Sequence, residues 1–121
     1  MIHPQEIEVW YVLPGVRKEI AANLIAKGWS QRQVAQKLGV TEAAVSQYVN
    51  HKRADHQKLD FPAEFKAYAR QVSDKIAVGE LDTFIAIQML MREFRKCGGL
   101  CQAHKAIDPK GIPEGCEVCL Q

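Results

Sequence analysis

Apolar residues recur every three or four positions along much of the chain, which is the spacing of the buried face of an α-helix. The pattern predicts a helix over Gly15–Lys27, which Gly28 would end. Glu6–Leu13 is short, apolar and bounded by prolines, so the pattern favours a helix there without excluding a strand. These features predict an all-α fold.

Two short helices are predicted next, joined by a tight turn at Gly39-Val40-Thr41. Ser30 followed by Gln33 has the spacing of a capping box, which would start the first of these helices. Thr41 can cap the second one. The apolar positions that would face inward are Val34, Ala35, Leu38, Ala44, Val45, Tyr48 and Val49. This arrangement is the sequence pattern of a helix-turn-helix.

The second half of the chain is predicted to contain two longer helices and an irregular tail. Polar residues over 55–60 indicate a linker, and Pro62 can occupy the first turn of a helix that runs to about Val78. A further helix over Thr83–Lys96 carries apolar residues on more than one narrow face, which suggests burial on two sides. The last 25 residues are rich in cysteine, glycine and proline, so we expect a small irregular segment that cannot form a core unless a cross-link, such as a bound metal, stabilises it.

Length and composition are those of a small globular protein. The 121 residues are 47% hydrophobic and 25% charged, which fits one compact core with a small appendage. No apolar run approaches the ~18 residues needed to cross a bilayer, and Met1–Leu13 lacks the features of a secretory signal. We therefore expect a cytoplasmic protein that makes no membrane contact.

Positive charge is concentrated in the middle of the chain. From Lys27 to Lys58, six basic residues stand against two acidic ones. Such an excess favours contact with the phosphates of a nucleic acid, because each neutralised phosphate releases counterions. Charge alone fits an ordinary solvated surface equally well.

The segment from Gly28 to Arg53, GWSQRQVAQKLGVTEAAVSQYVNHKR, resembles the phage-repressor-like (XRE) family of helix-turn-helix transcriptional regulators. More narrowly, Tyr11–Arg17 (YVLPGVR) and Thr41–Tyr48 (TEAAVSQY) are similar to a group of prokaryotic regulators, many of them archaeal. A subset of that group resembles this chain in its C-terminal cysteine pattern as well. The resemblance covers about half of the chain and implies a transcription regulator that binds double-stranded DNA.

In the resembled family, the start of the second helix enters the major groove. The residues that the resemblance places at base edges are Glu42, Ala43, Ser46 and Gln47, and Thr41 just before them is also expected to bind DNA. Gln47 is the best single candidate for recognising a base, because its amide can bond both N6 and N7 of adenine. Glu42 could accept from N4 of cytosine, although an acid at the mouth of the groove also repels phosphate. The residues placed at phosphates are Gln31, Arg32, Asn50, Lys52 and Arg53. A helix-turn-helix that serves only in packing is the alternative.

A single unit of this kind binds DNA weakly, and proteins of this class usually form dimers whose recognition helices lie one DNA turn, ~34 Å, apart. The wide apolar helix over Thr83–Lys96 is the natural dimer element, with ordinary core packing as the alternative. We therefore expect a homodimer. We divide the chain into a helix-turn-helix domain over residues 1–56, a helical linker and dimerisation region over 57–96, and a metal-binding segment over 97–121.

Four cysteines form two close pairs, Cys97-x3-Cys101 and Cys116-x2-Cys119. Stable disulfides are disfavoured in the cytoplasm, so the two pairs indicate a metal thiolate site, with unligated thiols or a redox disulfide as the alternative. Four thiolates suit an iron-sulfur cluster or zinc. We favour the cluster, because the first pair has three intervening residues rather than the two usual in zinc ribbons. His104 could replace a cysteine, although a surface or supporting role fits it better.

The sequence thus predicts a homodimeric, sequence-specific transcription regulator whose cysteine site senses redox state or iron supply. The alternative is a module that binds DNA or a protein partner and carries a purely structural zinc. We find no phosphate loop, no nucleophile with a suitable base and no carboxylate pair placed for acid-base work. We therefore expect no enzymatic activity and no small-molecule substrate.

Overall fold

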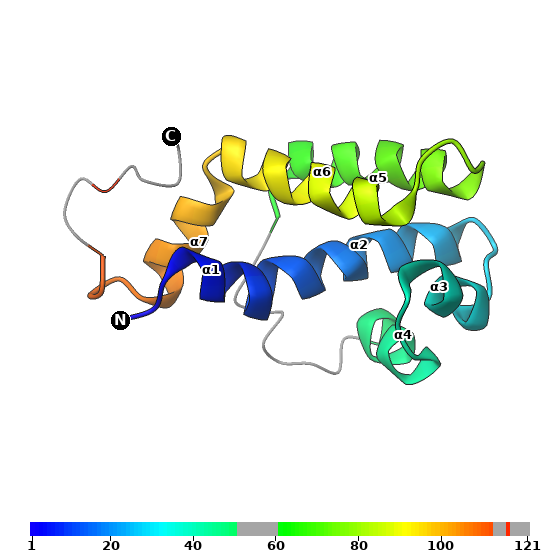
Figure 1. The fold of residues 1–121 in the computed structure, drawn as a ribbon, viewed down its shortest axis with the longest axis horizontal. Coiled ribbons are helices and arrows are strands. Elements are labelled where there is room, and N and C mark those ends of the chain that lie inside the picture. Colours follow the sequence, from blue (N-terminus) through cyan, green and yellow to red (C-terminus); the bar gives the residue numbers. More distant parts are fainter. Residues whose placement is uncertain (51–60, 113–115, 117–121) are drawn as a thin grey trace.

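A long helix runs through the middle of the protein, and most of the other helices pack against it (Figure 1). The computed structural model describes residues 1–50, 61–112 and 116, and within these ranges the secondary structure is helical, with no strand. The long helix consists of α1 (Pro4–Ile7), the π-helical turn η1 (Glu8–Val12) and α2 (Leu13–Ala26) in direct succession. The all-α expectation is therefore confirmed for the described residues, and Glu6–Leu13 is helical rather than extended.

Pro14 lies inside this long helix, where a proline would ordinarily break it. Proline has no backbone N–H, and its ring clashes with the carbonyl four residues earlier. In the structure the turn just before it is widened: the N–H of Leu13 donates to the carbonyl oxygen of Glu8, five residues back. A π-helical turn of this kind lets the helix continue through the proline, which places Pro14 at the start of α2.

Two short helices follow α2 at one end of the long helix (Figure 1). The first, α3 (Gln31–Leu38), and the second, α4 (Glu42–Val49), contact each other, and both pack against α2. Their bounds agree with the sequence prediction. The predicted linker over residues 55–60 lies outside the described residues.

Two longer helices, α5 (Ala63–Ala77) and α6 (Thr83–Lys96), cover the other side of α2 and contact each other. The bounds of α6 agree with the prediction, whereas Pro62 stands one position before α5, as its N-cap, rather than in its first turn. Phe61, Phe65 and Phe94 form an aromatic cluster between the two helices, with ring centroids 4.6 to 5.5 Å apart. The side chain of Asn23 on α2 donates to the buried hydroxyl of Ser73 on α5.

The expectation of an irregular C-terminal segment is wrong for residues 99–107, which form a further helix, α7 (Gly99–Ile107). Its inward side carries Leu100, Ala103, His104 and Ile107, the spacing of a helix that packs on a core. This helix contacts α1 and α6. Gly98, with φ of 81°, makes the sharp turn between α6 and α7, and burial of apolar side chains holds α7 on the core.

One continuous core joins all of these helices. It draws buried apolar side chains from the long helix, from α3 and α4, from α5 and α6, and from α7. An ion pair between Glu8 of η1 and Arg95 of α6 adds a contact at the surface. None of the helices in the described ranges is both long enough and apolar enough to cross a membrane.

Candidate nucleic-acid interface

The turns that set α3 and α4 against α2 are built from local hydrogen bonds. At the end of α2, Gly28 has φ of 97°, and the N–H of Trp29 donates to the carbonyl of Leu24 at 3.1 Å. The predicted capping box is confirmed: the N–H of Gln33 donates to the hydroxyl of Ser30 at 3.1 Å, and the N–H of Ser30 donates to the Gln33 side chain at 2.9 Å. The start of α3 is therefore defined by its own sequence.

The turn between α3 and α4 is equally well defined. Gly39 ends α3 in the left-handed region, with φ of 70°, which a residue with a side chain rarely adopts. The N–H of Ala44 donates to the hydroxyl oxygen of Thr41 at 3.1 Å, so Thr41 caps α4 as predicted. Thr41 was also predicted to bind DNA, and it is exposed, but the role that the structure gives it is that of a capping residue.

The helix α4 has an inner side and an outer side. Val45 and Tyr48 are buried, at 0% and 4% exposure, and attach the helix to the core. Of the residues predicted to face bases, Glu42 and Ala43 are exposed at the start of the helix, and Ser46 and Gln47 are half-buried one turn later. The structure therefore brings these four side chains onto one short helix whose opposite side is anchored.

Ser46 and Asn50 interact with each other on α4. The Nδ2 atom of Asn50 donates to the Oγ atom of Ser46 at 3.1 Å, and this contact is exposed to solvent. Asn50 was predicted to hold a phosphate and Ser46 to face a base. The structure joins the two residues one helical turn apart, where side chains four positions apart are neighbours.

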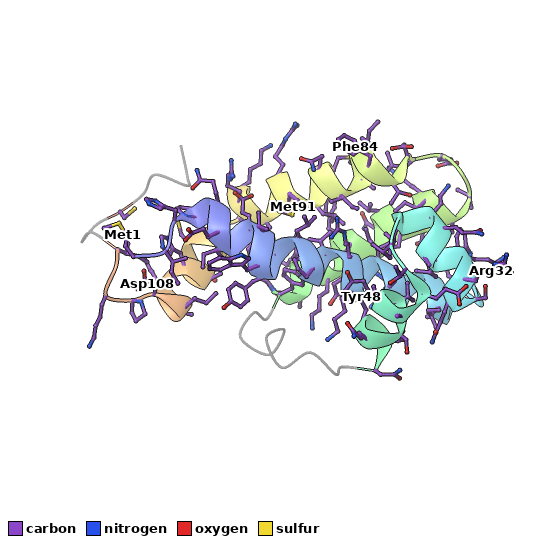
Figure 2. The ribbon with its side chains drawn as sticks, turned by 60° about the horizontal axis from the view of Figure 1, so that its bottom comes forward. Met1, Arg32, Tyr48, Phe84, Met91 and Asp108 are labelled. Atoms are coloured by element: carbon purple, nitrogen blue, oxygen red, sulfur yellow. The ribbon has the colours of Figure 1, made fainter. Side chains whose placement is uncertain are left out.

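The first turn of α3 carries the predicted phosphate contacts Gln31 and Arg32, both exposed. Arg32 projects away from the body of the protein, at the end formed by α3 (Figure 2). The start of a helix attracts anions, because its first N–H groups have no partner inside the helix and the dipole is positive there. The other two predicted phosphate contacts, Lys52 and Arg53, lie outside the described residues.

Lys27 contributed to the basic excess found in the sequence, but the structure gives it a partner within the protein. Its ammonium group pairs with the carboxylate of Asp74 on α5. These two residues are 47 positions apart, so no local pattern reveals the pair. The charge available to phosphates near α3 and α4 is correspondingly lower than the sequence count implied.

Arg17 on α2 is a candidate contact that the sequence analysis did not single out. Its Nε atom is buried and has no hydrogen-bond partner among the described residues. The guanidinium group stays charged in proteins, and a buried donor without an acceptor is costly. Arg17 belongs to the helix that packs against α4, and an acceptor supplied from outside the described residues, such as a phosphate oxygen, would satisfy it.

Cys97 and Cys101 lie at the C-terminal end of α6 and in the helix that follows it. Cys97 follows α6, is exposed, and donates from Sγ to the carbonyl of Phe94 at 3.3 Å; Cys101 is half-buried in α7. Cys116 is also half-buried, and Cys119 lies outside the described residues. Within the described ranges, no three potential ligands gather closely enough to hold a metal ion. The cysteine site therefore stays a prediction.

Of the two roles expected for His104, at the surface or in support of a metal site, the surface one is wrong, because the residue is buried. It is 8% exposed, on the inner side of α7, and its Nε2 atom hydrogen-bonds the carbonyl of Ile2. Since a carbonyl only accepts, Nε2 carries the proton in this contact. His104 therefore holds the start of the chain against α7, and its Nε2 atom is occupied by that hydrogen bond.

The family of TrfB plasmid transcriptional repressors, KORA, matches residues 13–79, which is more than half of the chain. The chain belongs to this family. The match begins with the first residue of α2 and ends just after α5, so it includes α3 and α4. It makes the protein a DNA-binding transcription regulator, and it leaves α6, α7 and the cysteines outside its range. No curated protein and no solved structure matches the chain.

Proposed function

We propose that the protein represses transcription by placing α4 in the major groove of a specific operator, with α3 and α4 acting as a helix-turn-helix. The observation that carries the proposal is the two-sided character of α4. Val45 and Tyr48 fix its inner side, while Ser46 and Gln47 lie together one turn beyond exposed Glu42. A recognition helix needs both a rigid attachment and a polar outer side. The resemblance to XRE-type regulators supports the same assignment.

The proposal is tested by operator binding. The wild-type protein is used to select a site from randomised duplex DNA, and the affinity of the Gln47→Ala variant for that site is then measured. A lost base contact is expected to lower affinity for the selected site by about 5- to 150-fold while affinity for unrelated DNA stays unchanged. Gln71→Ala, an exposed change on α5, is the matched control. Selection of no sequence by the wild-type protein would reject the proposal and leave a module that binds DNA without sequence preference or binds a protein.

The repressor is proposed to act as a homodimer through α6. The first turn of α6 exposes Phe84 and Ile85, at 73% and 52%. Figure 2 shows Phe84 on the outside of the protein. The other side of this helix, with Leu90 and Phe94, is already buried in the core. Among the described residues, only one of the two sides predicted to be buried is covered, and a second copy of the same helix would cover the other.

The dimer is tested by light scattering on a Phe84→Glu variant. A charge in a two-fold interface is expected to give a monomer that keeps its helical content, because this side chain makes little contact within the chain. Val9→Glu, an exposed apolar position on η1, is the control and should leave the dimer intact. A wild-type monomer at micromolar concentration, or an unchanged dimer in the Phe84→Glu variant, would contradict this proposal.

The cysteine pairs are proposed to hold an iron-sulfur cluster, with structural zinc as the alternative. The support is the spacing of the four cysteines, together with the position of Cys97 and Cys101 on either side of the turn at Gly98. Anaerobic purification followed by an absorption spectrum, with iron, sulfide and zinc quantified, separates the two. Matched iron and sulfide support the cluster and a sensing role; zinc at one per chain supports a structural ion, and absence of all three rejects both.

A further inference from the structure

The hydrogen bond between Asn50 and Ser46 has a direction, and that direction limits what Ser46 can do. The Nδ2 atom of Asn50 is a donor only, so at 3.1 Å the Oγ atom of Ser46 must be the acceptor. A hydroxyl group carries one hydrogen, and this contact leaves that hydrogen uncommitted. Asn50 therefore occupies one of the two acceptor lone pairs of Ser46 and leaves its only hydrogen available for donation.

The hydroxyl of Ser46 behaves differently from that of Ser73, which donates to its own helix. A serine within a helix often donates to the carbonyl four residues earlier. Ser73 on α5 does this: its hydroxyl donates to the carbonyl of Ala69 at 2.8 Å. Within the described part of the chain, the only hydrogen bond of the Ser46 hydroxyl is the one that it accepts from Asn50. The hydrogen is thus available to a partner outside the described residues.

We propose that Asn50 orients Ser46 as a hydrogen-bond donor to a base edge, and that Asn50 is a positioning residue rather than a phosphate contact. The inference rests on the proposed function, because it assumes that α4 enters the major groove. There, guanine, adenine and thymine each offer an acceptor, at N7, O6 or O4, whereas cytosine offers only the N4 donor. Because Asn50 takes one of the two lone pairs of Ser46 and leaves the hydrogen available, we expect the operator to disfavour cytosine, rather than a base that offers an acceptor, at the position that Ser46 contacts.

The test uses a change that reverses the hydrogen bond. In Asn50→Asp the carboxylate only accepts, so Ser46 must donate to it, and the lone pairs of the hydroxyl then face the groove. These lone pairs can accept from N4 of cytosine. The readout is the affinity for the selected operator divided by the affinity for the same operator with cytosine at the contacted position. We expect this ratio to fall by about 5- to 150-fold, because the variant gains affinity for the operator with cytosine relative to the selected one.

Two controls separate the reversal from the effect of added charge. Gln36→Glu makes the same change from amide to carboxylate at an exposed position of α3. Its repulsion of phosphate lowers affinity for both duplexes alike and leaves the ratio unchanged. The double variant Ser46→Ala with Asn50→Asp lacks the hydroxyl, so it should show no gain for cytosine.

Each outcome has a separate meaning. If the wild-type protein selects no sequence, the proposed function itself fails. If it selects an operator but Asn50→Asp leaves the ratio unchanged, the proposed function stands and the inference about Asn50 is overturned. A gain for cytosine that persists in the double variant also overturns it, because the new carboxylate would then contact the base directly. A gain that depends on Ser46 supports it.

Discussion

His104 and Ile2 are joined by a hydrogen bond of 2.5 Å between Nε2 of the imidazole and the backbone carbonyl oxygen. The N–H of the same Ile2 donates to the carboxylate of Asp108 at 2.8 Å. Both backbone polar groups of Ile2 are therefore held by α7 and the residue that ends it. Figure 2 shows Met1 and Asp108 near each other at the end of the protein away from α3. The start of the chain is thereby attached to a helix that lies outside the family match.

The His104→Leu variant is expected to be less stable. Leucine fills a similar volume but cannot donate to the carbonyl of Ile2, and an unpaired polar group that is partly buried costs about 1–3 kcal/mol. Denaturant unfolding followed by circular dichroism measures the free energy of unfolding. Lys105→Leu, at the exposed neighbouring position, is the control and should change that free energy little. Equal stability of the two variants would contradict the role assigned to His104.

Removal of the cap of α4 in Thr41→Ala is expected to lower the free energy of unfolding by about 0.5–2 kcal/mol, because the N–H of Ala44 loses its acceptor. Thr41→Ser keeps the hydroxyl and should retain most of the stability. The two variants are compared by thermal and denaturant unfolding. A serine variant as unstable as the alanine variant would mean that the methyl group of Thr41, rather than its capping oxygen, stabilises the helix.

Glu42 is expected to favour the helix and oppose DNA binding. It is exposed in the first turn of α4, where a negative charge interacts with the helix dipole by about 0.3–1 kcal/mol. The Glu42→Gln variant should therefore be slightly less stable and should bind all duplexes more tightly, most clearly at low salt. Titrations of the selected operator and of unrelated DNA at two salt concentrations measure this. Weaker binding to the operator alone would identify Glu42 as a base reader instead.

Arg17→Met is expected to weaken DNA binding without destabilising the protein. The variant removes a buried donor that has no partner in the described structure, so its free energy of unfolding should not fall. If Arg17 contacts a phosphate, affinity should fall for all sequences, and the slope of log K against log salt should decrease by about 1. Arg17→Lys keeps the charge and serves as the control. An unchanged slope in Arg17→Met would show that its partner is not DNA.

Sequence signals that act over a few residues predicted the helices well. The Ser30 and Gln33 capping box, the Thr41 cap and the glycines that end helices are local, so α3, α4 and α6 have the predicted bounds. The Ser46–Asn50 contact is also local, and its spacing of four residues on a predicted helix could have revealed it. These features depend on backbone geometry that neighbouring residues determine by themselves.

Features that depend on distant partners could not be predicted. The pairing of Lys27 with Asp74 and the burial of Arg17 Nε arise only when α2 packs against other helices. The helix α7 was missed for another reason: its apolar spacing at Leu100, Ala103 and Ile107 was present, but the adjoining glycines and cysteines favoured a metal-bound loop. The base-facing roles of Gln47 and its neighbours depend on DNA and are decided by binding experiments.

The wide turn at Glu8–Val12 also determines how the side chains before it are rotated about the helix axis relative to those after it. Ile7 and Val12 are both buried, yet in a regular α-helix residues five apart point about 140° away from each other. The π-helical turn uses more residues per turn and so brings both side chains onto the core. The part of the helix next to α7 and the part next to α4 thereby keep a common inner side. Loss or gain of one residue in this turn would rotate one end of the protein against the other by about 100°.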